Sequence, residues 1–349
     1  MQAGEPQAEA GVQAAPAEWT LPKRPGVGAN VWKFIRRKPL GAFGMFLVIL
    51  MVAMTVGPPK AEFGVPDLPN SPLGFELGKP FMARFDAKDV FREGERGVSV
   101  GSIDRFLEPS GQHWFGTDRG GHDTYSVMIY AARRSLFIGL WALTFATIVG
   151  CTIGVVSAYF RGWSDTMVQR FMDSIQAFPP LILLILIISV FDPNLTIMAI
   201  ALGIVGVTSV QRIVRGVVLS TREEPYVEAA RVLGATDLRT MVFHILPNIM
   251  APVIVVFTIG LGSVILAEAA LAFIVPESVP SDPSWGIMLH FTQEHMPPFP
   301  PFLPFTLFEG TPEGYHTLAA GGAIVLAVLG FNLAGDGLRD VLDPRLRVG

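Results

Sequence analysis

Six apolar segments dominate this sequence and limit what it can fold into. They are residues 40–57, 135–160, 171–191, 195–210, 249–275 and 318–335, some of which reach spanning length only with their flanks. A helix needs about 20 mostly apolar residues to cross the hydrocarbon core of a bilayer. Only 16% of the 349 residues are charged, whereas a soluble domain carries roughly a quarter. We therefore predict an all-α integral membrane protein with six transmembrane helices.

A polar triplet separates the third and fourth apolar segments. Asp192-Pro193-Asn194 combines a proline, which cannot continue a helix, with two side chains that bond to nearby backbone. We therefore expect residues 171–210 to form a helical hairpin.

The distribution of lysine and arginine predicts the orientation of the spans. Basic residues collect before residue 40, after the second span, within 212–239 and in the C-terminal tail, whereas 192–194 and 276–317 contain none. Positive charge favours the cytoplasmic side, so both termini should be cytoplasmic. The segment 58–134 also contains basic residues, including Arg133 and Arg134 at its end. Long loops, however, cross membranes largely regardless of charge.

These assignments divide the chain into consecutive parts. We expect a disordered cytoplasmic N-terminus, a basic flank with the first transmembrane helix, an extracytoplasmic segment, a core of five transmembrane helices, and a cytoplasmic tail. The corresponding ranges are 1–30, 31–57, 58–134, 135–335 and 336–349, and the core includes a polar stretch at 222–248 and an outer loop at 276–317. Helical spacing of Tyr125, Met128, Ile129 and Ala132 predicts a surface helix before the second span. The first span should be a retained anchor, because no clear cleavage site follows it.

Several kinds of chemistry have no sequence signal. The chain lacks GxxxxGK[ST], HExxH and CxxC, and its single cysteine is Cys151. A net charge of −4, without a basic run interleaved with aromatic residues, argues against nucleic-acid binding. His290, Glu294 and His295 are better interpreted as solvated loop residues than as a metal site. We expect no catalytic residue, no metal and no cofactor.

The most unusual stretch is EAARVLGATDLRTMVFHILPN, residues 228–248, which is polar and helical between two spans. Ala230, Leu233, Leu238, Met241, Val242 and Ile245 should form most of one apolar stripe. Gly234 predicts a bend between two short helices, and Pro247 predicts a second turn before the fifth span. The stretch therefore resembles an elbow on the cytoplasmic face. It suits a docking element for a soluble partner, and the alternative is a membrane-surface helix without one.

Two acidic residues and several glycines lie within the spans. Glu268 should face protein or water, because charge at mid-bilayer is costly. It could line a translocation path or, as an alternative, form a hydrogen bond across a helix interface. We expect Asp173 to be a structural anchor. We also expect glycines such as Gly150 and Gly154 to serve close helix packing instead of a hinge.

The elbow resembles the EAA motif of binding-protein-dependent ATP-binding-cassette (ABC) importer permeases. The matching residues are Glu228, Ala229, Ala230, Gly234, Leu246 and Pro247, and His244 occupies a position where the general motif often has isoleucine. The segments HWFGTDRGGHD, YAARRSLFIGL, AYFRGWSD, MDSIQAFPPL, ILAEAALAF, DPSWGIML and FNLAGDGLRDVLDPRLR are similar to the C-type subunit of dipeptide and oligopeptide permeases. The likeness covers about residues 30–349, with gaps at 60–105 and 292–317.

This resemblance implies a type I (MetI-like) importer fold in the cell inner membrane. The elbow would be the coupling helix that contacts an ATPase. The implied partners are a second permease subunit, two ATPase subunits and an extracytoplasmic solute-binding protein. The chain would then be no enzyme, and its cargo would be di- or oligopeptides.

Three other functions stay open at the level of sequence. The same machine could import nickel or another small solute. An ion-coupled secondary transporter is disfavoured by the scarcity of intramembrane acids and by the absence of an internal repeat. A membrane scaffold without transport is disfavoured by the extent of the EAA resemblance.

Overall fold

The protein is described by a computed structural model covering residues 35–36, 38–56, 82–83, 107–118, 121–191, 194–276, 283–293 and 312–342. Apart from one isolated β-bridge between Thr117 and Asp123, every regular element in these ranges is helical. The all-α prediction is therefore confirmed. The helices are α2 (Pro39–Thr55), α3 (Thr124–Phe160), α4 (Gly162–Gln176), α5 (Pro180–Val190), α6 (Leu195–Thr221), α7 (Pro225–Val232), α8 (Asp237–Arg239), the π-helix η1 (Thr240–Ile245), α9 (Leu246–Ile274), α10 (Trp285–Gln293) and α11 (Pro312–Leu342).

Four helical stretches in the described ranges are long and apolar enough to cross a membrane. They are Thr124–Phe160, Leu195–Thr221, Asp237–Ile274 and Tyr315–Leu342, and the bent pair α4 and α5 would make a fifth if it counts as one span. The predicted first span corresponds to the 17-residue helix α2, at the short end of spanning length. Helix lengths alone do not give six spans, so that number stays a prediction.

The third predicted span is not one helix. α4 ends at Gln176, α5 begins at Pro180, and the two are bent by 85°. Pro179 and Pro180 explain the break, because neither has an N–H to continue the ladder. The turn after α5 lies partly outside the described residues. Asn194 caps α6 there by accepting a hydrogen bond from the Ile197 N–H at 2.9 Å.

The second span begins earlier than predicted. α3 is one continuous helix from Thr124, and Asp123 caps it by accepting from the Ser126 N–H at 2.9 Å. The surface helix predicted over 125–132 is therefore the first part of α3, and the predicted boundary at 134 falls inside it. Arg133 is buried, and its Nε donates to the Thr55 carbonyl at 3.0 Å.

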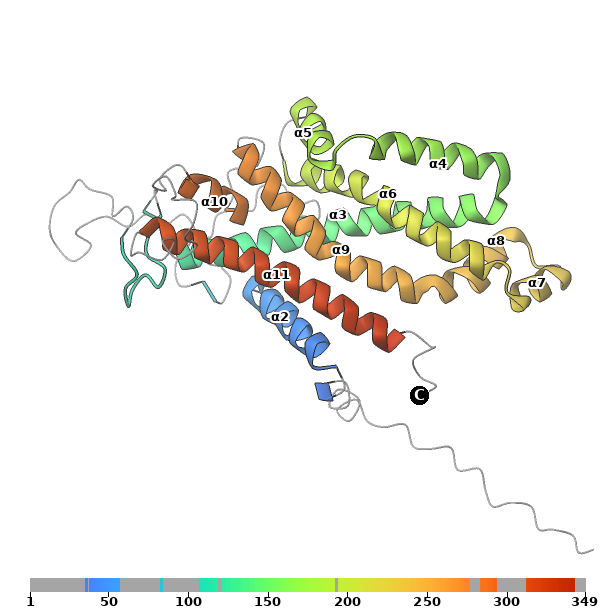
Figure 1. Cartoon of the computed structure of the whole chain (residues 1–349), viewed down its shortest axis with the longest axis horizontal. Helices are drawn as coiled ribbons and strands as arrows, with labels where there is room; N and C mark the ends of the chain where they lie inside the picture. The colour runs from blue at the N-terminus through green and yellow to red at the C-terminus, as the bar shows by residue number, and fades with distance from the viewer. Residues whose placement is uncertain are drawn as a thin grey trace, which may run out of the picture.

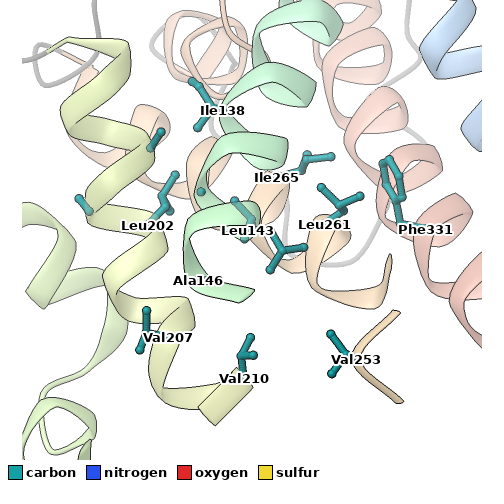
Figure 2. Packing of buried hydrophobic residues seen from close by; sticks show 14 of the residues in the cluster. Ile138, Leu143, Ala146, Leu202, Val207, Val210, Val253, Leu261, Ile265 and Phe331 are labelled. Atoms are coloured by element: carbon teal, nitrogen blue, oxygen red, sulfur yellow. The ribbon is translucent and has the colours of Figure 1, made fainter. Parts of the chain in front are cut away.

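The core lies where α3, α6, α9 and α11 pack together (Figures 1 and 2). Gly150 and Gly154 of α3 face α6 so closely that a Cβ at each would lie 3.0 Å from the carbonyl oxygens of Val207 and Gln211. The prediction that these two glycines serve packing is confirmed.

The helices α2 and α11 run side by side. At Gly44 of α2, an added Cβ would lie 2.5 Å from the backbone nitrogen of Ala334 in α11. Lys38, at the start of α2, pairs with Asp340, near the end of α11, at 2.6 Å. The N-terminal end of α2 therefore meets the C-terminal end of α11. In Figure 1, α7 and α8 lie at one end of the molecule and α10 at the other.

Candidate functional site

The bend of the elbow is a helix C-terminus that requires glycine. α7 ends at Val232, and Gly234 follows its C-cap with φ of +87°. The Ala235 N–H donates to the Ala230 carbonyl at 3.0 Å, and the Gly234 N–H donates to the Arg231 carbonyl at 2.9 Å. These two bonds define a Schellman motif, whose C′ residue is left-handed. The predicted bend at Gly234 is therefore confirmed.

The second half of the elbow continues into α9 without the predicted turn. The Thr236 side chain accepts from the Arg239 N–H at 3.4 Å and starts α8. The chain then passes through η1 into α9, so that Asp237–Ile274 forms one helical stretch of 38 residues. The predicted turn at Pro247 is wrong. The Leu246 N–H bonds to Met241, five residues back, and the wider π-helical turn gives the proline ring room beside the preceding backbone.

Only part of the predicted apolar stripe is buried. Of its six residues, Ala230, Met241 and Ile245 pack inward, with exposed fractions below 9%. Val227, which was not part of the predicted stripe, is also buried. By contrast, Leu233, Leu238 and Val242 are 86%, 69% and 41% exposed, so their predicted place on a buried stripe is wrong. The reason is geometric: the predicted stripe assumes one continuous helix over 226–246, whereas the bend at Gly234 turns the chain in a new direction.

The exposed apolar side chains of the elbow form a surface that we call the elbow patch. It consists of Tyr226, Val232, Leu233, Leu238, Val242 and Phe243, each at least 41% exposed. Exposed apolar residues concentrated on one short segment are typical of a protein contact. Glu228 and Ala229 are also exposed on α7.

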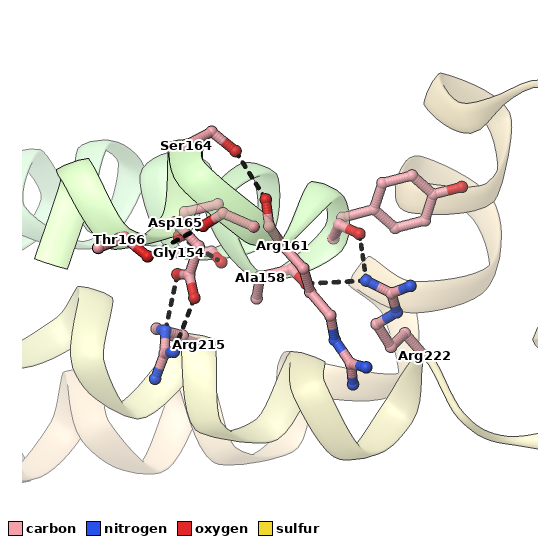
Figure 3. Close-up of polar contacts among 11 residues, drawn as sticks. Gly154, Ala158, Arg161, Ser164, Asp165, Thr166, Arg215 and Arg222 are labelled. Atoms are coloured by element: carbon pink, nitrogen blue, oxygen red, sulfur yellow. Dashed lines mark hydrogen bonds and ion pairs between the residues drawn. The ribbon is translucent and has the colours of Figure 1, made fainter.

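Tyr159, at the end of α3, holds both halves of the elbow. Its hydroxyl donates to Asp237 Oδ1 at 2.7 Å, and the guanidinium of Arg231 lies 4.9 Å from its ring centroid. Arg222 at the end of α6 donates to the carbonyls of Tyr159 and, at 3.3 Å, Ala158 (Figure 3). Sequence reasoning missed Tyr159, and its only signal was its place in the AYFRGWSD segment.

Two ion pairs brace the neighbouring ends of α4 and α6. Arg215 binds both oxygens of Asp165, at 2.8 and 2.7 Å (Figure 3), and Arg161 pairs with Glu223. The Arg161 guanidinium lowers the pKa of the exposed Glu223 carboxyl. All four residues line an open depression of about 780 Å³. Farther along α4, the predicted anchor Asp173 pairs with Arg212 of α6 at 3.1 Å.

The predicted site residues fall into three places. Glu228, Ala229, Ala230 and Gly234 lie together on α7 and its cap, where Ala230 is buried. Leu246 and Pro247 lie beyond η1, at the start of α9. Glu268 lies near the opposite end of α9, fully buried, with its oxygens 2.8 and 2.9 Å from the hydroxyls of Ser135 and Ser284.

Most outer-loop residues lie outside the described ranges. They include nearly all of 60–105 and much of 292–317, the two stretches that the family resemblance does not cover. Of the three residues considered for a metal, only His290 is described. Its Nδ1 lies 2.7 Å from the Phe273 carbonyl oxygen.

Comparison with known proteins places the chain among transport proteins. Residues 150–348 match the model of the binding-protein-dependent transport system inner membrane component. The dipeptide transport system permease protein DppC of Alkalihalophilus pseudofirmus is 40% identical over 243 residues, which cover 70% of this chain and 75% of that protein. A putative peptide transport system permease protein of Brucella suis is 39% identical over 244 residues, covering 70% and 77% of the two chains.

The glutathione transport system permease protein GsiD of Pectobacterium atrosepticum is 34% identical over 268 residues, covering 76% of this chain and 81% of the relative. Together with the apolar helices, these matches identify a multi-pass membrane protein and confirm the resemblance seen in the sequence. The chain belongs to the family of binding-protein-dependent ABC transport system permeases.

Proposed function

We propose that the chain forms half of the translocation pathway of an ATP-driven peptide importer. A second permease subunit supplies the other half, two ATPase subunits dock on the cytoplasmic side, and a solute-binding protein delivers the cargo. The chain itself binds no nucleotide and catalyses no reaction. Its task is to convert movement of an ATPase into a change in the pathway.

The elbow is the observation that carries this proposal. Its patch offers apolar side chains to a partner, while Glu228 adds a charge on the same short helix. The Schellman motif and Tyr159 hold the bend in shape. Because α8, η1 and α9 form one helical stretch, a force applied at the elbow acts directly on a membrane span.

The arrangement of charge supports a cytoplasmic elbow and cytoplasmic termini. Arg161, Arg215, Arg222 and Arg231 all lie near the elbow, and positive charge favours the cytoplasmic face. The pairing of Lys38 with Asp340 brings the ends of the first and last spans together. An even number of spans is consistent with that contact.

The relatives favour peptides as the cargo. Their names specify dipeptides, peptides and glutathione, and glutathione is itself a tripeptide. We therefore assign short peptides as the substrate class of this importer.

Substitutions on the exposed face of the elbow test this function without disturbing the core. Leu233→Glu and Glu228→Arg should leave the subunit in the membrane at the wild-type level but reduce co-purification of the ATPase subunits and uptake of labelled peptides. Val341→Glu is the matched control, because it places a new carboxylate on an exposed apolar position of α11. If Leu233→Glu and Glu228→Arg retain wild-type ATPase binding and uptake, the elbow is not the docking element.

A further inference from the structure

The short helix α10 packs against α9 near the end of α9 that is remote from the elbow. Gly286 lies so close to α9 that an added Cβ would come within 2.2 Å of the Ala269 carbonyl oxygen. The Trp285 side chain is buried, and its Nε1 donates to the Met128 carbonyl of α3 at 3.0 Å. His290 adds the contact to Phe273 of α9. α10 is thus bound to both α3 and α9.

Glu268 lies at the centre of this attachment. Ser135 of α3 donates to its Oε2 at 2.8 Å, and Ser284, just before α10, donates to its Oε1 at 2.9 Å. All three residues have an exposed fraction of 0%. One carboxyl group therefore joins α9 to α3 and to the segment before α10, and we call these three residues the Glu268 clasp.

The clasp and the elbow lie toward opposite ends of one helical stretch, so a displacement at the elbow can reach the clasp. Asp237 and Ile274 are the ends of one 38-residue helical stretch, which spans roughly 55 Å at about 1.5 Å per residue. The elbow lies at one end, and α10 is bound at the other (Figure 1). A close backbone contact at Gly286 and a buried polar clasp both resist sliding of α10 along α9, because sliding would leave buried polar groups unpaired.

We propose that Glu268 is a positioning residue that makes α10 move as one body with α9. Displacement of the elbow is thereby carried to α10 at the extracytoplasmic end of the pathway. This inference rests on the proposed coupling function of the elbow. It assigns the Glu268 carboxyl to a contact between helices, where it accepts hydrogen bonds, and gives it no charge-dependent contact with the cargo.

Substitution by glutamine separates these two roles. A glutamine amide at residue 268 has an oxygen that accepts from one serine hydroxyl and an N–H that donates to the other. Glu268→Gln should therefore preserve the clasp while removing any charge. Glu268→Ala removes both contacts and leaves two buried hydroxyls. Ser284→Ala removes the contact between Glu268 and the segment before α10, together with the hydrogen bond that Ser284 Oγ accepts from the Gly286 N–H at 3.2 Å.

The test is a distance between spin labels at Ile274→Cys and Phe291→Cys, at exposed positions on α9 and α10. Both are introduced in a Cys151→Ser background of the complete transporter in lipid nanodiscs. The distance should be narrow and equal in the ATP-free and vanadate-trapped states of the wild type and of Glu268→Gln. It should broaden in Glu268→Ala, with peptide uptake lowered roughly tenfold or more, as expected for two lost hydrogen bonds.

Ser284→Ala should broaden the distance less than Glu268→Ala does. Ser189→Ala is the control, because Ser189 is exposed and its hydroxyl bonds within its own helix, to the Leu186 carbonyl. A wild-type distance that changes between the two states overturns the rigid unit. Loss of uptake in Glu268→Gln with a narrow distance overturns the clasp in favour of a charge in the pathway. Normal uptake and a narrow distance in Glu268→Ala also overturn it, and if that variant does not assemble, Glu268→Gln and Ser284→Ala decide the matter.

ATPase co-purification is measured in parallel on every variant. It should be unchanged throughout, because the clasp is remote from the elbow. A failure of elbow docking would therefore be seen separately from a failure of the clasp.

Discussion

The bend at Gly234 depends on a backbone conformation that other residues adopt at a cost. Its φ is +87°, and an added Cβ would meet no atom within 4 Å. Gly234→Ala therefore introduces no clash, and its whole effect is the cost of left-handed backbone for an L-residue, roughly 1–2 kcal/mol. A cost of that size increases the equilibrium population of the opened elbow by roughly 5- to 30-fold.

Trypsin provides a direct assay, because the bend is flanked by Arg231 and Arg239. When opening and closing are fast, the cleavage rate follows the opened population. Cleavage after these arginines in the purified permease pair, identified by fragment mass, should be faster in Gly234→Ala by the factor above. Gly234→Asn should fall between alanine and wild type, since asparagine tolerates the left-handed region better.

Gly216→Ala is the matched control for this series. Gly216 lies inside α6, and an added Cβ there also meets nothing within 4 Å, but its φ is not in the left-handed range. This variant should leave cleavage at the elbow unchanged. Equal cleavage rates in Gly234→Ala and Gly216→Ala would refute the argument that backbone conformation holds the bend.

Three further substitutions test contacts seen in the structure. Tyr159→Phe should accelerate tryptic cleavage of the elbow about fivefold, because it removes the hydrogen bond to Asp237, worth about 1 kcal/mol, and unchanged cleavage would exclude that role. Gly154→Leu should lower the free energy of unfolding by about 1–3 kcal/mol or prevent assembly, because even an added Cβ would lie 3.0 Å from the Gln211 carbonyl oxygen. An unaltered Tm in thermal unfolding would contradict this close packing. Asn194→Ala should cost about 1 kcal/mol through loss of the α6 cap, measured by the same thermal unfolding, and an unchanged Tm would show the cap to be dispensable.

The positions of the long helices were predictable because the bilayer sets their length. Segments 135–160, 195–210, 249–275 and 318–335 each lie within or across a helix of the structure. The start of α3 was not predictable from hydropathy. Arg133 and Arg134 look too polar for a span, but both side chains are buried. The average hydropathy of a segment does not reveal that the rest of the protein covers its charged residues.

The candidate site was predictable in its local features and less so in its contacts. Gly234 indicates a bend, because a glycine at a helix end is a recognisable C-terminal signal. Tyr159 and Ser135 gave no such signal, since their partners Asp237 and Glu268 are remote in sequence. Contacts of that kind depend on how helices assemble, and a single sequence does not contain that information in a local pattern.

At Pro247, where the elbow continues into α9, a local sequence rule gave the wrong prediction. A proline disfavours helix in the residue before it, and that rule predicts a turn at Leu246. The chain instead forms a π-helical turn, in which the Leu246 N–H reaches Met241. π-helical turns are found frequently at functional sites, and this one keeps the elbow continuous with α9. A turn at Pro247 would have made a flexible joint, whereas the continuous helix carries displacement from α8 to the Glu268 clasp.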